Sequence, residues 1–174
     1  MGELPRIVAI DANVLICNGS GSGDRKEKIE HLLSRIDKAK GKVIIPTPAI
    51  AEYLVRADKA GLAVLDALQK RSSVVVATFD LAAAYETALI DAAAIGRDDK
   101  RDGSEQAWQK IKVDRQIVAI AKSQGAKLIV SDDEGVRDTA ARVGISAVNI
   151  DALPLPDHAR QTKLPIADHA SEDE

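Results

Sequence analysis

The segment IVAIDANVLI, residues 7–16, places one acid, Asp11, directly after a short apolar run. A short buried strand is predicted at residues 6–10, because this mostly apolar run is too short for a helix. An acid among apolar neighbours recurs in three more segments, with Glu52 in PTPAIAEYL (46–54), Asp114 in IKVDRQIVAIA (111–121) and Asp133 in KLIVSDDEG (127–135). A carboxylate is costly to bury without a partner, and few basic residues lie close by. We therefore expect the four acids to share a bound cation.

Short apolar strands alternate with helices along the whole chain. Strands are predicted at 6–10, 42–46, 73–77, 127–130 and 145–150. Helices are predicted at 24–40, 62–70, 81–95 (with Asp80 as N-cap), 107–124 and 134–142. A further helix is predicted to begin with Thr47 as its N-cap. Polar and glycine-rich composition predicts a flexible loop at 18–23 and a second loop at 96–106. The alternation indicates an α/β fold with a mainly parallel sheet that is covered on both faces.

Length and composition favour one globular domain. The chain has 174 residues, 45% of them apolar and only 2% aromatic, so the core must be built mainly from aliphatic side chains. No apolar run is long enough to cross a bilayer, and the first residues lack a signal-peptide layout. The single cysteine, Cys17, excludes an internal disulfide and argues against a thiolate zinc site. We expect a cytoplasmic protein with no membrane association.

Charge is unevenly distributed. The net charge is −3, but residues 151–174 hold six acids and two bases, which leaves the rest of the chain at +1. If four of the remaining acids hold a metal, the other surface is mildly basic, which permits phosphate binding. We expect residues 1–150 to form the domain and 151–174 to be an acidic extension, partly disordered, without its own core.

The predicted elements bring the acids together. Ligands of open α/β sheets bind outside the carboxyl ends of the strands, where Asp11, Asp133 and the helix with Glu52 are expected. Asp114 differs, since its neighbours at helical spacing are apolar and place it within a buried stripe. For Asp114 alone, a carboxylate paired with a Lys or Arg at the rim of the stripe is the alternative. The three other acids favour a common site.

Carboxylates without His or Cys form a hard-oxygen site, which suits Mg²⁺ or Mn²⁺ better than Zn²⁺. One or two such ions can generate a hydroxide and stabilise the charge that develops on a phosphodiester. No nucleophile–His pair and no glycine-rich phosphate motif was found in the sequence. The pattern therefore predicts metal-dependent hydrolysis without a protein nucleophile.

IDANVLI (10–16), PTPAIAEYL (46–54) and VDRQIVAIAKSQGAKLIVSDD (113–133) together resemble the PIN-domain ribonucleases in order and context. The resemblance covers about 6–150 and is strongest to the VapC-type toxins of toxin–antitoxin pairs. It implies a PIN-like three-layer α/β/α fold with about five strands. It also implies a metal-dependent endoribonuclease that binds RNA, an antitoxin protein and a second copy of itself.

Carried over by position, the resemblance assigns catalysis and metal binding to Asp11, Glu52, Asp114 and Asp133, with no further cofactor. Three residues are expected to support them. Asn13 contributes a polar group, caps a helix, or does both. Ser131 orients the cluster or forms a turn. Asp132 replaces Asp133, assists it, or is a solvated acid. Many members carry a further Asp where this chain has Gly135.

Three alternatives stay open at this point. The first is a PIN-domain nuclease of RNA processing without an antitoxin. The second is a phosphatase of the haloacid-dehalogenase type with Asp11 as nucleophile, although Asn13 replaces its usual second Asp. The third is a non-catalytic binding module. Arg115 is interpreted as a surface charge rather than a phosphate ligand.

Overall fold

Five parallel strands form one sheet in the order β3-β2-β1-β4-β5 in a computed structural model that describes residues 4–20, 23–157 and 159. The strands are β1 (Ile7–Ile10), β2 (Lys42–Pro46), β3 (Val74–Ala77), β4 (Leu128–Val130) and β5 (Ser146–Val148). The helices are α1 (Ala12–Ser20), α2 (Asp24–Lys38), α3 (Thr47–Leu54), α4 (Lys59–Gln69), α5 (Leu81–Gly96), α6 (Trp108–Ser123) and α7 (Glu134–Arg142), with a 3₁₀ turn η1 (Ile150–Ala152). The predicted α/β class with a parallel sheet is confirmed.

The strand order reverses between β1 and β4. The chain moves from β1 outward to β2 and β3, then crosses back to β4 on the other side of β1. Ile10 pairs with Val130 at the carboxyl ends of these two strands. The backbone N–H of Asp11 continues the ladder by donating to the carbonyl of Val130, at 3.2 Å. A reversal of this kind leaves a crevice at the strand ends, which is where ligands bind in open α/β sheets.

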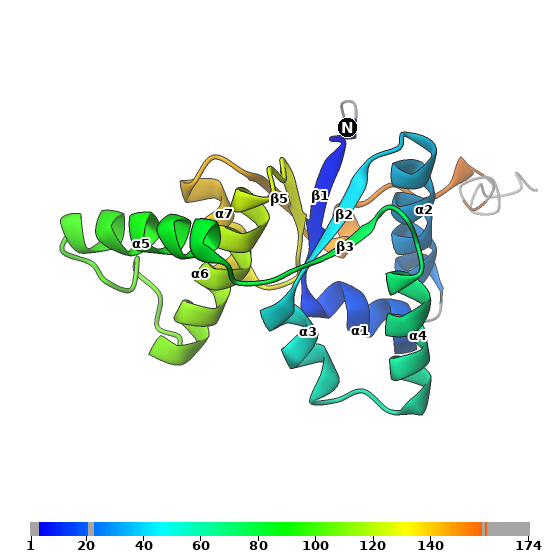
Figure 1. Ribbon diagram of the computed structural model, residues 1–174, viewed down its shortest axis with the longest axis horizontal. Coiled ribbons are helices and arrows are strands. Elements are labelled where there is room, and N and C mark those ends of the chain that lie inside the picture. Colours follow the sequence, from blue (N-terminus) through cyan, green and yellow to red (C-terminus); the bar gives the residue numbers. More distant parts are fainter. Residues whose placement is uncertain (1–3, 21–22, 158, 160–174) are drawn as a thin grey trace, which may run out of the picture.

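Each face of the sheet has its own helical layer, and Figure 1 shows the two layers on opposite sides of the strands. Alternate strand residues, such as Val8 and Val43, pack with α1, α2 and α4. The other set, such as Ala9 and Ile44, packs with α5, α6 and α7. Since the central strands are buried on both faces, they consist of continuous aliphatic runs, as a parallel sheet requires.

Several predicted boundaries were wrong, and the helix predicted at 62–70 begins at Lys59 instead. Helix α1 extends through Asn18 and Gly19, where a loop was expected, and residues 21–22 lie outside the described residues. A Cβ at Gly19 would lie 3.0 Å from the Tyr53 hydroxyl, so close packing of α1 on α3 explains the glycine there. Helix α3 has Pro46 rather than Thr47 at its N-cap position. The Asp80 cap is confirmed, with its side chain accepting from Ala83 N–H at 2.9 Å.

The start of the acidic extension packs on the domain. Strand β5 ends at Val148, and η1 follows with Asn149 as its cap. Leu153 is buried in the same apolar cluster as α1 and α2. Residues 160–174 lie outside the described residues, so the expected disorder of the extension stays a prediction. None of the helices in the described part combines the length and apolarity of a membrane span.

Candidate functional site

Asp11 lies at the carboxyl end of β1 with its side chain almost fully enclosed. One carboxylate oxygen accepts the Ala12 N–H at 2.6 Å, and the other accepts the Ser131 hydroxyl at 2.7 Å. The Asn13 side-chain amide donates to that second oxygen at 3.3 Å. Burial raises the pKa of Asp11, and the bonds from Ser131 and Ala12 oppose the rise. Asn13 lies inside α1 and orients Asp11, so it is not a helix cap.

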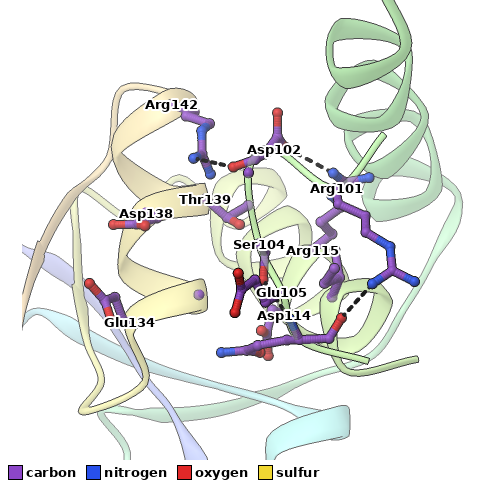
Figure 2. Close-up of a pocket in the computed structure, with 14 residues that line it drawn as sticks. Arg101, Asp102, Ser104, Glu105, Asp114, Arg115, Glu134, Asp138, Thr139 and Arg142 are labelled. Atoms are coloured by element: carbon purple, nitrogen blue, oxygen red, sulfur yellow. Dashed lines mark hydrogen bonds and ion pairs between the residues drawn. The ribbon is translucent and has the colours of Figure 1, made fainter. Parts of the chain in front are cut away.

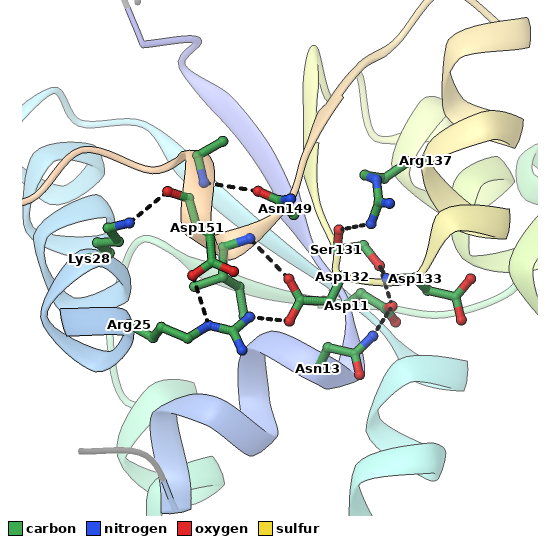
Figure 3. Close-up of polar contacts among 12 residues, drawn as sticks. Asp11, Asn13, Arg25, Lys28, Ser131, Asp132, Asp133, Arg137, Asn149 and Asp151 are labelled. Carbon is green, nitrogen blue, oxygen red and sulfur yellow. Dashed lines mark hydrogen bonds and ion pairs between the residues drawn. The ribbon is translucent and has the colours of Figure 1, made fainter. Parts of the chain in front are cut away.

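Ser131 connects Asp11 to Asp133. Its hydroxyl donates to Asp11 and accepts the backbone N–H of Asp133 at 3.0 Å, as Figure 3 shows. Ser131 is fully buried at the end of β4, so its hydroxyl is held in one place. This geometry supports both expected roles, because the hydroxyl contacts Asp11 and also forms a turn by accepting the N–H two residues later.

Asp133 is the N-cap of α7. Its side chain accepts the N–H groups of Gly135 at 2.8 Å and Val136 at 3.4 Å. Burial raises the pKa of Asp133. The hydrogen bond and charge of Lys110 lower it, as do these two backbone N–H groups, and together they outweigh burial, so the pKa lies below its ordinary value. Asp133 therefore stays ionised at the site.

Asp132 is directed elsewhere. Its carboxylate pairs with Arg25 of α2 and accepts the Ile150 N–H at 3.1 Å. In Figure 3 the side chains of Asp132 and Asp133 extend in opposite directions from the end of β4. Asp132 thus joins α2 to η1, and this arrangement separates it from the acids around Asp11.

Asp114 lies on the buried stripe of α6, as expected, with 2% of its surface exposed. Burial raises the pKa of Asp114 to about 6, and the neighbouring Lys110 opposes the rise. The pairing with Lys110, four residues earlier on the same helix, is the alternative that the sequence left open. Burial and pairing therefore coexist at Asp114.

The expectation that basic residues are scarce around the acids was wrong. The ammonium of Lys110 contacts Asp114 and lies 2.7 Å from a carboxylate oxygen of Asp133. Burial lowers the pKa of Lys110, but its two carboxylate partners outweigh this and raise it. Its spacing of four residues from Asp114 was a signal that could have revealed this contact.

Glu52 lies half-buried on α3, beside the other acids. Burial raises the pKa of Glu52, the charges of Asp11 and Asp133 raise it further, and Lys110 opposes them. Glu52 therefore lies within range of the charges of Asp11, Asp133 and Lys110 at the strand ends. The structure thus brings the four predicted acids, Asp11, Glu52, Asp114 and Asp133, into one region.

Gly135 is a further residue of this region that sequence reasoning did not assign a role. A Cβ at this position would lie 2.6 Å from an Asp114 oxygen and 3.2 Å from an Asp133 oxygen. A side chain here would have to displace the acids, so the missing side chain makes room for them. The sequence carried no signal of this close approach.

The donor chemistry fits a hard divalent cation. Carboxylates predominate, the pKa values of Asp11, Glu52 and Asp114 are raised, and an ammonium already neutralises part of the charge. Within residues 4–20, 23–157 and 159, however, no group of three His, Cys, Asp or Glu side chains is already positioned to hold a metal ion. The acids therefore form a suitable donor set rather than a closed cage.

A pocket of about 310 Å³ opens beside Asp114 and Gly135, between α7 and residues 101–106. Figure 2 shows Arg142 of α7 on one side of it and Arg101 on the other. Both arginines are exposed to solvent. The pocket therefore adds basic groups next to the acids, and Asp102, Glu105, Glu134 and Asp138 also line it.

The wall of this pocket is fixed by Arg115, which is 1% exposed and not the surface charge that was expected. Its guanidinium binds Asp91 at 2.6 Å, Asp102 at 2.9 Å and the Lys100 carbonyl at 2.8 Å. It also lies 5.5 Å from the ring centre of Trp108. The loop after α5 is thereby tied to α5 and α6.

Similarity to known proteins agrees with this geometry. Solved structures that match include DNA-bound VapBC2 from Rickettsia felis (13% identity, covering 82% of this chain and 98% of that chain, TM-score 0.59) and DNA-bound VapBC from Salmonella typhimurium (22% identity, covering 82% and 97%, TM-score 0.52). The sarcin-ricin-loop-cleaving toxin VapC20 of Mycobacterium tuberculosis also matches (16% identity, covering 78% and 94%, TM-score 0.50). At these identities the likeness concerns the fold. No curated protein sequence matches.

A family model gives the assignment. The model of the PIN domain matches residues 8–142, which include all four acids and the strands that position them. The chain therefore belongs to the PIN domain family.

Proposed function

We propose that this protein is a Mg²⁺- or Mn²⁺-dependent endoribonuclease and the toxin of a type II toxin–antitoxin pair. The observation that carries the proposal is the convergence of Asp11, Glu52, Asp114 and Asp133 where β1 and β4 end side by side. Membership of the PIN family supports the nuclease class. Solved structures similar to this chain include two VapBC complexes and a sarcin-ricin-loop-cleaving toxin, which supports the toxin assignment.

In this proposal the four acids hold the metal. Ser131 and Asn13 orient Asp11 through their hydrogen bonds, and the cap of α7 holds Asp133 at a fixed distance from them. When bound, such an ion polarises a phosphoryl oxygen and activates a water molecule. The protein residues supply orientation and charge, and none of them acts as the nucleophile.

The pocket beside Asp114 gives the RNA a place next to the acids. Arg101 and Arg142, at its two sides, offer positive charge to the phosphates that flank the scissile bond. Arg115 contributes only indirectly, because its guanidinium is committed to Asp91, Asp102 and Lys100.

Protein partners are part of the proposal. Exposed apolar side chains, which a protein partner would cover, include Leu54, Val55 and Leu62 on α3–α4 and Leu81, Tyr85 and Leu89 on α5. We propose an antitoxin and a second copy of the chain as the partners, and a cytoplasmic location. Light scattering of the purified protein, alone and with the product of an adjacent small reading frame, measures both associations.

The phosphatase alternative has less support. It needs an acid–base group two residues after Asp11, but Asn13 stands there and its amide donates to Asp11. A side-chain amide does not act as an acid or a base near neutral pH, so Asn13 cannot protonate a leaving group.

RNA cleavage by purified protein tests the proposal. Wild type should cleave with Mn²⁺ or Mg²⁺ and stop in EDTA, and Asp11→Asn and Asp133→Asn should lose activity while staying folded. Asp132→Asn is the matched control, since the adjacent acid binds Arg25 and Ile150 rather than the cluster. Undiminished cleavage by Asp11→Asn and Asp133→Asn would refute the nuclease assignment.

A further inference from the structure

One lysine lies among the acids that are proposed to bind a divalent cation. Lys110 lies one helical turn before Asp114 on α6, and its ammonium bridges Asp114 to Asp133, the N-cap of α7. The two acids are 2% and 17% exposed, whereas the lysine side chain is 34% exposed. A cationic group thus reaches from the rim of the site onto two enclosed carboxylates.

The positive charge of Lys110 acts on the whole cluster. It lowers the pKa of Asp11 and Glu52 through space, in addition to its direct contacts with Asp114 and Asp133. Four carboxylates this close repel one another, and a single ammonium reduces that repulsion. The lysine therefore stabilises the arrangement of the acids.

A divalent cation needs oxygen atoms of the same carboxylates. An ammonium in contact with these carboxylates competes with that ion, because two cations in one site repel and Lys110 already occupies one oxygen of Asp114 and one of Asp133. The lysine side chain is a flexible four-carbon chain with a strongly hydrated end. Its exposure at the rim gives it a path into solvent.

We propose that Lys110 is a built-in counter-cation, which holds the acids together without metal and must leave Asp114 and Asp133 before a divalent ion binds there. This inference rests on the proposed metal-dependent function. Its consequence is a metal affinity lower than the four carboxylates alone would give. The lysine sets the metal concentration at which the site fills.

The alternative is an ordinary structural ion pair with no effect on the metal, and Lys122 provides the comparison. Lys122 lies on the same helix, is also 34% exposed, and pairs with Glu86 at 2.8 Å, away from the four acids. Lys110→Met and Lys122→Met therefore remove the same charge from the same helix. Only the first removes it from the proposed metal site.

Calorimetric titration with Mn²⁺ tests the proposal. Lys110→Met should bind Mn²⁺ about tenfold more tightly than wild type, which corresponds to losing one competing ion pair. Lys122→Met should bind like wild type. In EDTA, Lys110→Met should melt at a lower temperature than wild type, and saturating Mn²⁺ should close that gap.

A second measurement uses wild type alone, in case Lys110→Met does not fold without metal. Mn²⁺ should increase the labelling of Lys110 by an amine-acylating reagent, measured by peptide mass spectrometry, and leave Lys122 unchanged. Unchanged affinity in Lys110→Met, or unchanged labelling of Lys110, overturns the inference while Mn²⁺ binding by wild type keeps the proposed function. Failure of wild type to bind Mn²⁺ overturns both.

Discussion

The hydroxyl of Ser131 donates a 2.7 Å hydrogen bond to Asp11 across 120 residues of sequence. This bond joins the carboxyl ends of β1 and β4, the two strands between which the sheet reverses its order. The same hydroxyl accepts the N–H of Asp133, so one buried group fixes two of the four acids. Disturbing this relationship should affect stability and metal binding together.

Ser131→Ala should lower the free energy of unfolding by about 1–3 kcal/mol, because it leaves a buried carboxylate oxygen and a backbone N–H with fewer partners. Urea denaturation measures the loss, and titration with Mn²⁺ should show weaker binding. Ser131→Thr, which keeps the hydroxyl, is the control and should bind Mn²⁺ better than Ser131→Ala. Equal stability and affinity in wild type and Ser131→Ala would contradict the assigned role.

Gly135→Ala should disturb the acids directly, since the new Cβ would lie 2.6 Å from an oxygen of Asp114. We expect a loss of about 1–3 kcal/mol in unfolding free energy, as for other overpacked sites, and reduced RNA cleavage. Gly96→Ala is the matched control, because beyond its chain neighbours and its own helix backbone nothing lies within 4 Å of a Cβ at that position. If both variants behave like wild type in denaturation and cleavage, the close approach is unimportant.

Arg115→Met should cost about 3–5 kcal/mol of stability, because it leaves the enclosed Asp102 without a buried cation. Asp102 is only 7% exposed, and its pKa is lowered although burial opposes this, through Arg97, Arg142 and Arg115. Arg97→Met removes the 51% exposed partner of the same acid and should cost less than about 1 kcal/mol. Thermal denaturation of the two variants compares them, and a similar small loss in both would show that Arg115 does not anchor the loop.

Asp37 should make stability depend on acid pH. The Ser73 hydroxyl and the Arg71 guanidinium hold the pKa of Asp37 below its ordinary value of 3.8. A lowered pKa in the folded state stabilises the protein above the unfolded value, and this contribution is lost as the pH falls through the folded value. Asp37→Asn should therefore melt below wild type at pH 7, and the gap should shrink once the pH falls below 3.8.

The expected gap is less than about 1 kcal/mol, because Asp37 and Arg71 are partly exposed and water screens their attraction. Melting temperatures across a pH series measure it. Asp66→Asn is the matched control, because it removes the same charge from an exposed acid on α4. A gap for Asp37→Asn that stays constant down to the lowest pH would contradict the stated cause.

Local sequence was enough to predict most of the elements, although not the extent of helix α1. Aliphatic runs bounded by polar turns predicted all five strands to within a few residues, because strands buried on both faces leave this pattern. Asp80 capped its helix as expected, since capping depends on three or four neighbouring residues. The buried stripe of α6 that contains Asp114 could also be predicted, because helical spacing depends on residues three or four positions apart. Alternation of strands and helices also predicted the parallel sheet.

Tertiary structure decided which polar groups meet. The sequence shows Asp132 and Asp133 as equal neighbours, but only the packing of η1 and α2 supplies Arg25 and Ile150 as partners of Asp132. Burial of Arg115 likewise depends on α5 and the following loop, which contribute Asp91 and Asp102.

Local pattern records which residues turn inward and which begin a helix, since these depend on spacing along the chain. It does not record what a side chain contacts across the sheet, because that depends on how separate elements pack. The contact of Lys110 with Asp133 illustrates this limit. The sequence by itself determined the fold and the four acids, and only the tertiary structure placed a lysine between two of them.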